Sequence, residues 1–76
     1  MTTIARAQRA IDKAGIPLIL IRGEGYHYFV YDDHGPNYDT VSVMVPYTKD
    51  YSAAEWADLA AYTLADIKQR IKQRGY

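Results

Sequence analysis

The residues best suited to chemistry in this chain are two histidines and three aspartates near its middle. They are His27, Asp32, Asp33, His34 and Asp39. Imidazole and carboxylate groups can bind metal ions, but no recognised ligand spacing links these five. Asp32 and Asp33 are neighbours on an expected strand, so their side chains point to opposite faces of a sheet. We therefore expect no metal and no other cofactor.

Two further motifs fall short of an active site. The run Gly23-Glu-Gly25 is too short for a phosphate-binding loop and leads into a strand, so it lacks the helix N-terminus that attracts anions. Ser42 and Ser52 are the only serines, and Ser52 is needed as a helix cap. A nucleophile with a positioned base is therefore missing. The sequence predicts that this protein is not an enzyme.

The composition is that of a small domain with few means of stabilising itself. The chain has 76 residues, a net charge of zero and no cysteine, and we expect residues 1–76 to form a single domain. Its core is thin, and neither disulfides nor thiolate zinc sites can support it, so a homo-oligomer is expected. No stretch approaches the roughly 20 apolar residues of a membrane span, and no signal peptide is recognisable. We expect a cytoplasmic protein without membrane contact.

Charge is distributed unevenly along the chain. Lys and Arg predominate in residues 1–22 and 67–76, whereas residues 23–66 hold every carboxylate except Asp12 and one cation, Lys49. One interpretation is an electrically polarised molecule with an acidic hairpin and basic helix ends. The alternative is an ordinary solvated surface whose charges match the helix dipoles. Zero net charge argues against direct nucleic-acid binding. Nucleic-acid binding would require the basic surfaces of the two helices to lie side by side. The residues of that surface would be Arg6, Arg9, Lys68, Arg70, Lys72 and Arg74.

An amphipathic helix is expected at each end of the chain. Thr2 or Thr3 can cap the first, and Gly15 with Pro17 ends it. A capping box of Ser52 and Glu55 begins the second, which runs to a stop at Gly75. The apolar stripes are Ile4, Ala7, Ile11 and Ala14 in the first helix, and Trp56, Leu59, Ala60, Leu64, Ile67 and Ile71 in the second.

Three segments between the helices read as strands, at residues 18–21, 26–33 and 40–47. The turn at 23–25 and the loop at 34–39 are too short for parallel crossovers. The order α-β-β-β-α therefore predicts an α+β fold, with a three-stranded antiparallel meander and both helices on one face. The other face of the sheet is left uncovered.

Successive side chains of a strand point to opposite faces of the sheet, so the second and third strands each place one alternate set of residues on the open face. Val41, Val43 and Val45 are expected to face the core. We predict that Tyr28 and Val30 join these valines. In the alternative, Phe29 points inward and the tyrosines point outward. The predicted open face, which would pair two copies of the chain, consists of His27, Phe29, Ser42 and Met44, with Tyr31 beside them.

The second hairpin combines aromatic rings with carboxylates. The chain has eight tyrosines, more than a core of this size requires, and tyrosine is frequent at the centres of binding surfaces. Such a tip suits a protein partner with a basic surface. In the alternative, the aspartates only cap turns in a solvated loop. The predicted contact residues are Phe29, Tyr31, Asp32, Asp33, Tyr38 and Asp39.

The segment Gly23-Glu-Gly-Tyr-His-Tyr-Phe-Val-Tyr-Asp-Asp33 resembles the glycine-tyrosine hairpin of small orphan proteins of phages and prophages. Its beginning and its Asp-Asp end are similar to the hairpin of an anti-CRISPR protein that mimics DNA. The resemblance implies a non-enzymatic inhibitor of a host defence complex that handles nucleic acid. That mimic is acidic throughout, whereas this chain is neutral, so the resemblance extends only to the hairpin. The alternative is a self-associating structural or regulatory homodimer with no defence role.

Overall fold

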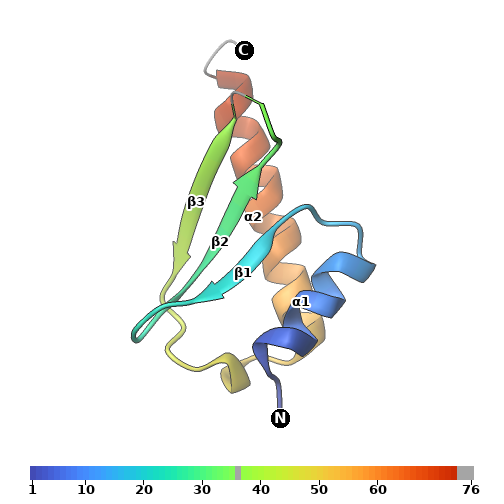
Figure 1. Ribbon diagram of the computed structural model, residues 1–76, viewed down its shortest axis with the longest axis vertical. Coiled ribbons are helices and arrows are strands. Elements are labelled where there is room, and N and C mark those ends of the chain that lie inside the picture. Colours follow the sequence, from blue (N-terminus) through green and yellow to red (C-terminus); the bar gives the residue numbers. More distant parts are fainter. Residues whose placement is uncertain (36, 74–76) are drawn as a thin grey trace.

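Two helices lie on one side of a three-stranded sheet (Figure 1). The computed structural model describes residues 1–35 and 37–73. The strands form an antiparallel meander in the order β1-β2-β3, which confirms the predicted α+β architecture. The elements are α1 (Ile4–Lys13), β1 (Ile19–Arg22), β2 (His27–Asp32), β3 (Tyr38–Val43), a short 3-10 turn η1 (Thr48–Asp50) and α2 (Ala53–Gln73).

Helix α1 begins and ends as its local sequence predicts. The Thr3 hydroxyl accepts a hydrogen bond from the Arg6 N–H at 3.2 Å. Beyond the helix, Gly15 has φ +74°, a conformation that glycine adopts more easily than other residues. The Ile16 N–H then donates to the Ile11 carbonyl at 3.1 Å, as in a Schellman motif. This end directs Ile16 into the core, where it is buried in the same cluster as Ile11.

Helix α2 begins with the predicted capping box. The Ser52 N–H donates to Glu55 Oε1, and the Glu55 N–H donates to the Ser52 hydroxyl, each at 3.1 Å. The two bonds satisfy amides that have no partner inside the helix. The predicted stop at Gly75 lies outside the described residues.

Trp56 lies at the centre of the core between the sheet and the helices. It is fully buried, and its indole N–H donates to the Thr48 carbonyl at 2.8 Å. Its ring centroid is 6.3 Å from that of Phe29 and 5.0 Å from that of His27. The apolar core comprises Ala7, Ile11, Ile16, Leu18, Leu20, Phe29, Val45, Trp56, Ala60 and Ile67.

Strand β2 buries the opposite set of side chains from the one we predicted. Phe29 pairs with Val41 and His27 pairs with Val43, and residues directly opposite each other share a face of the sheet. Phe29 and His27 are therefore on the core face, where both are fully buried. Their predicted place on the open face is wrong, and the structure has the alternative orientation with Phe29 inward. Tyr28 points outward.

His27 is buried because both of its ring nitrogens have partners. Nδ1 lies 2.6 Å from the Val45 carbonyl oxygen, and Nε2 lies 2.7 Å from the Thr48 hydroxyl. A carbonyl oxygen can only accept, so we assign the proton to Nδ1, and in the neutral ring Nε2 accepts from Thr48. These bonds connect β2 to the segment that leads into η1.

Strand β3 ends at Val43, whereas the sequence predicted a strand to residue 47. The Val45 N–H donates to the Val43 carbonyl at 2.8 Å, which turns the chain out of the ladder. Pro46 follows and has no N–H with which to continue it. Val45 is buried nevertheless, as predicted for the valine face.

Candidate functional site

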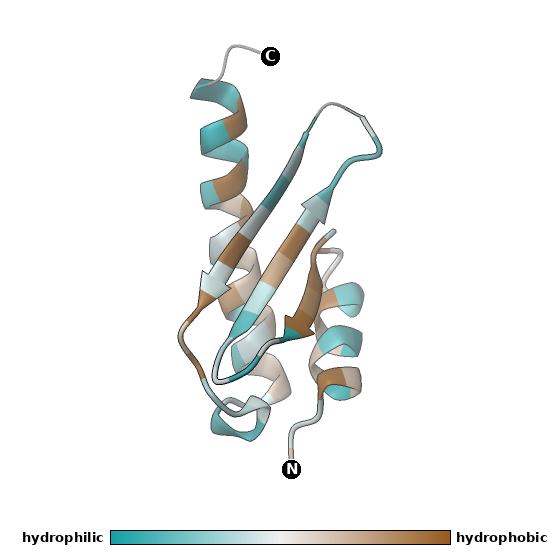
Figure 2. Cartoon of the chain, turned by 60° about the vertical axis from the view of Figure 1, so that its left-hand side comes forward, coloured by the Kyte–Doolittle hydropathy of each residue, from teal (hydrophilic) through white to brown (hydrophobic). Residues whose placement is uncertain are grey.

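The face of the sheet that points away from the helices is formed by two rows of side chains. We call it the outer face. Strand pairing aligns Ile19, Val30 and Thr40 in one row, and it aligns Ile21, Tyr28 and Ser42 in the next. Figure 2 views the molecule with the sheet in front of α2, so that this face is turned toward the reader.

Several large side chains of this face are in contact with solvent. Ile19 is 56% exposed, and Tyr38, which pairs with Asp32 at one end of the face, is 60% exposed. At the other end, the Tyr26 ring lies 6.0 Å from the Tyr28 ring. A small domain that leaves an Ile and three Tyr side chains on one uncovered face has a surface suited to protein contact.

Tyr26 keeps its place because the residue beside it has no side chain. A Cβ atom on Gly23 would lie 2.7 Å from two atoms of the Tyr26 ring. The Gly23 N–H also donates to the Tyr26 carbonyl at 2.8 Å, which closes the β1–β2 turn. The Tyr26 ring therefore packs against Gly23 at this turn, in space that any side chain at position 23 would fill.

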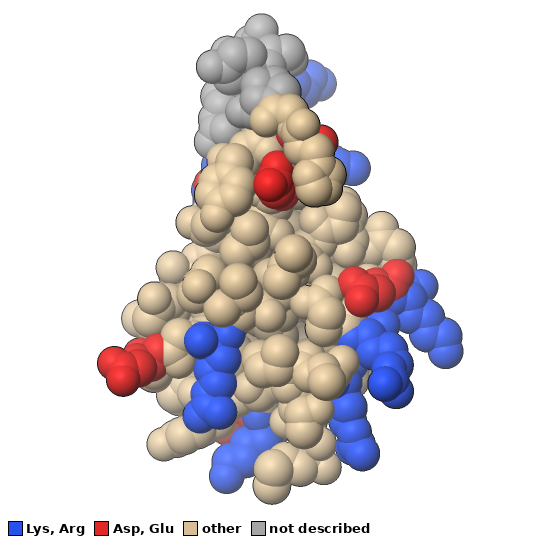
Figure 3. Space-filling view, viewed as in Figure 1, with Lys and Arg blue, Asp and Glu red and all other residues tan. Residues whose placement is uncertain are grey.

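The two rows contain no charged residue. In the view of Figure 3, Lys and Arg gather over the lower part of the molecule, and the centre of the view has neither sign of charge. An uncharged surface has no charge to desolvate when it is buried. A partner that covered this face would therefore gain free energy from its apolar area.

The edge of β1 is closed by a side chain from α1. Gln8 Oε1 accepts from the Leu20 N–H at 2.8 Å, and Gln8 Nε2 donates to the Leu18 carbonyl at 2.9 Å. These are backbone groups that an added strand would otherwise bond. Gln8 therefore protects this edge against strand addition.

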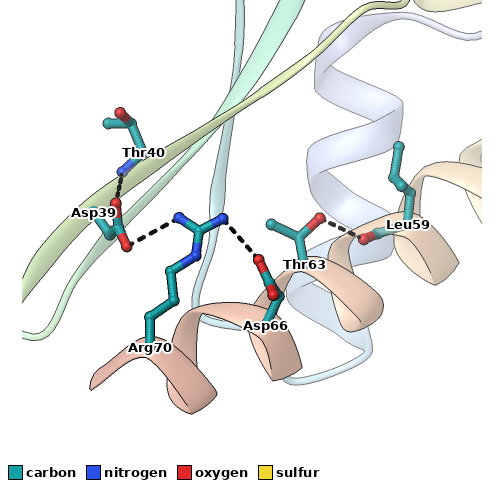
Figure 4. A network of polar contacts seen from close by, with 6 residues as sticks. All are labelled: Asp39, Thr40, Leu59, Thr63, Asp66 and Arg70. Carbon is teal, nitrogen blue, oxygen red and sulfur yellow. Dashed lines mark hydrogen bonds and ion pairs between the residues drawn. The ribbon is translucent and has the colours of Figure 1, made fainter. Parts of the chain in front are cut away.

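The edge of β3 is partly closed by a network that connects it to α2 (Figure 4). Asp39 Oδ1 accepts from the Thr40 N–H at 2.9 Å, and Asp39 Oδ2 lies 3.5 Å from Arg70 Nη1. Arg70 Nη2 in turn bonds Asp66 Oδ2 at 2.8 Å. One edge amide thus has a partner within the chain, and the Asp39 carboxylate is paired with a helix.

The aspartates of the β2–β3 loop bond its backbone. Asp33 Oδ1 accepts from the N–H groups of Gly35 and Asn37 at 2.8 and 3.3 Å, and Asp33 Oδ2 accepts from the Asn37 side chain at 2.8 Å. The Asn37 side-chain bond, followed by the Gly35 bond, lowers the pKa of Asp33 below its usual value. Asp32 Oδ1 accepts from the His34 N–H at 2.9 Å. This is the turn-capping alternative considered for the sequence.

Comparisons with family models, curated proteins and solved structures found no significant match to the chain. Within residues 1–35 and 37–73, no helix is long and apolar enough to span a membrane. The same residues contain no group of three or more His, Cys, Asp or Glu that could hold a metal ion. A function must therefore be inferred from the geometry of the outer face and the loop.

The structure separates the residues that the sequence assigned to partner contact. Asp32, Asp33 and Tyr38 are exposed, and they lie together at the β2–β3 end of the molecule. Tyr31 is partly buried against the core. Phe29 is fully buried and cannot contact a partner, because it packs beneath the sheet against Trp56.

The predicted dimer face is divided in the same way. Ser42 is exposed on the outer face, and Met44, directly after β3, is 82% exposed. His27 is fully buried on the core side of the sheet, as Phe29 is, so it cannot take part in a contact on the outer face. Sequence reasoning did not name Ile19, Ile21 and Thr40 for this face, and it wrongly placed Tyr28 and Val30 in the core. Strand alternation alone could not assign the faces, because both sets of side chains in β2 contain large rings.

Proposed function

We propose that this chain is a non-enzymatic protein-binding module whose contact surface is the outer face. The observation that supports this proposal is the pair of uncharged rows on a face that neither helix covers. Burial of apolar surface contributes about 25 cal/mol per Å², so such a face gains free energy when another protein covers it. Tyr28, beside Val30, provides a rigid ring of the kind that dominates contact surfaces.

The partner packs onto the face and does not extend the sheet. Gln8 occupies two backbone groups at the β1 edge, the Leu20 N–H and the Leu18 carbonyl, and Asp39 occupies an amide at the β3 edge. An added strand would have to displace these side chains before it gained any hydrogen bond. The exposed side chains of the outer face require no such displacement.

A second candidate function uses the acidic end of the same molecule. Asp32, Asp33 and Tyr38 are exposed there, and the carboxylates can meet Lys or Arg of a partner. In this candidate, the chain is a phage-derived inhibitor of a host CRISPR-type complex and acts in the host cytoplasm. The hairpin resemblance supports it, and the hydrogen bonds of Asp33 within the loop weigh against it.

One capture experiment distinguishes the two candidates. The purified chain is used to capture its partner from a lysate of the source organism, and binding is then measured for three variants. Val30→Lys places a charge at the centre of the outer face. Asp32→Asn with Asp33→Asn removes two charges and keeps one acceptor oxygen in each side chain for the loop backbone. Ala61→Lys, at an exposed position of α2, is the control.

If the outer face binds the partner, Val30→Lys weakens binding roughly tenfold or more, since one buried unpaired charge costs well over 1.4 kcal/mol. The other two variants bind as the wild type does. If the acidic loop binds it, the double variant associates more slowly and loses salt dependence, and Val30→Lys has no effect. Equal affinity of Val30→Lys and wild type contradicts the primary proposal. Circular dichroism checks that each variant is folded.

A further inference from the structure

We infer that the partner on the outer face is a second copy of this chain, packed face to face across a two-fold axis perpendicular to the strands. The inference rests on the proposed function and adds the identity and register of the partner. Its basis is the order of side chains along the two rows.

A two-fold axis that passes between the two rows exchanges them, because such an axis makes each contact occur twice. Ile19 then faces Ile21 of the second copy, and Val30 faces Tyr28 of the second copy. On β3, Thr40 faces Ser42 of the second copy. Apolar residues meet apolar residues on β1 and β2, and hydroxyl groups meet on β3.

The residues at the ends of the face also match under this operation. Asp32 reaches the place of Tyr26 in the second copy, where the phenol hydroxyl can donate a hydrogen bond to the carboxylate. Tyr38 reaches the end of β3 in the second copy, beside Met44. These two side chains are 60% and 82% exposed in the single chain, so both gain burial in the pair.

The other two-fold axis in the plane of the contact runs along β2, and it gives a poorer match. It would place β1 over β3, so that Ile19 faced Thr40 and Ile21 faced Ser42. It would also bring Asp32 against Asp32 of the second copy. Two carboxylates at contact distance repel each other, and burial raises that cost. Charge and polarity therefore both favour the axis across the strands.

The size of the face sets the strength of the pair. Two rows extend about 13 Å along the strands, and three strands cover about 14 Å, so the two rows supply roughly 200 Å² of flat area. A standard interface has about 800 Å² per partner. The end residues must therefore contribute, and we expect a weak dimer with a dissociation constant on the order of micromolar.

The absence of cysteine from the sequence allows a direct test of the register. Thr40→Cys and Ser42→Cys are made in separate chains at exposed positions, and the two variants are mixed and mildly oxidised. Immunoglobulin domains show that a disulfide can bridge two stacked sheets. The mixture should give roughly tenfold more cross-linked dimer than either variant alone, because pairing raises the effective concentration of the two thiols.

Two controls identify the alternatives. A mixture of Ile19→Cys and Thr40→Cys chains reports the axis along β2, and Ala61→Cys reports random collision. The inference is overturned if the Thr40→Cys and Ser42→Cys mixture forms no more dimer than Ala61→Cys, or if the Ile19→Cys and Thr40→Cys mixture cross-links instead. If the cross-linking fails but Val30→Lys no longer binds a partner captured from the lysate, the proposed function stands and only the second-copy inference is wrong. If Val30→Lys still binds that partner, the proposed function and the inference are both wrong.

Discussion

Asp33 holds the β2–β3 loop with both of its carboxylate oxygens. Its bonds with Gly35 and Asn37 favour the charged form and keep the pKa of Asp33 below the ordinary value of 3.8. Protonation weakens acceptors that the loop backbone uses. The carboxylate therefore contributes to local structure at neutral pH whether or not it also meets a partner.

The sign of the resulting pH dependence follows from the lowered pKa. The unfolded chain binds a proton at Asp33 more readily than the folded chain does, so acid favours unfolding. The contribution of Asp33 to stability is fully present above its ordinary pKa and is lost as pH falls through the lowered value. We expect the difference in free energy of unfolding between wild type and Asp33→Asn to shrink as pH falls from neutral to below the ordinary pKa of 3.8.

Urea denaturation at a series of pH values measures this difference. Asp58→Asn, at an exposed position of α2, is the matched control, because it removes a carboxylate without touching the loop. A wild-type advantage over Asp33→Asn that is constant, or that increases in acid, would show that the loop bonds do not stabilise the charged carboxylate.

His27 illustrates which residue-level features could not be predicted. A histidine between tyrosines in a strand gives no sign of its face. Its burial depends on Val45 and Thr48, which lie outside the strands and become neighbours only when the chain after β3 turns back. Local patterns do not specify that path, so the partners of the imidazole were not foreseeable.

At the scale of elements, the helix caps were predicted correctly, but the end of β3 and the register between the strands were not. The Ser52 and Glu55 box involves residues three apart, and it formed as expected. The register depends on loop length. Five residues, 33–37, separate the last pair of β2 and β3, which puts Phe29 opposite Val41. A loop longer or shorter by one would have reversed the face, and the sequence did not show which length the loop adopts.

The contact between α1 and β1 provides a prediction at this scale. Gln8→Met keeps the length and much of the volume of the side chain but removes both hydrogen bonds at the β1 edge. We expect a loss of about 1–2 kcal/mol in the free energy of unfolding, the usual net value of two such bonds. The Leu20 amide should also exchange its hydrogen faster.

Hydrogen exchange measured by NMR, together with urea denaturation, tests this prediction. Arg9→Met changes the next residue of α1, which is exposed, and serves as the control. If the Leu20 amide exchanges at the same rate in Gln8→Met and in wild type, the side chain does not close the edge.

At the scale of the whole molecule, the two basic segments lie far apart. Helix α1 with Arg6 and Arg9 lies at one end, and the last turns of α2 with Lys68 and Lys72 lie at the other (Figure 1). Arg70 of that second segment pairs with Asp39. The described residues therefore do not form the continuous basic surface that the nucleic-acid hypothesis required. The outer face occupies the middle of the molecule between these ends.

The most direct test of the outer face as the contact surface is a methyl NMR titration of the labelled chain. Binding is followed by raising the concentration of the chain itself, or by adding a captured partner. Contact at the outer face predicts that the methyl signals of Ile19, Ile21 and Val30 shift, and that those of the buried Ile11 and Ile67 do not. Shifts confined to methyl groups of α2, with all three outer-face signals unchanged on binding, would contradict it.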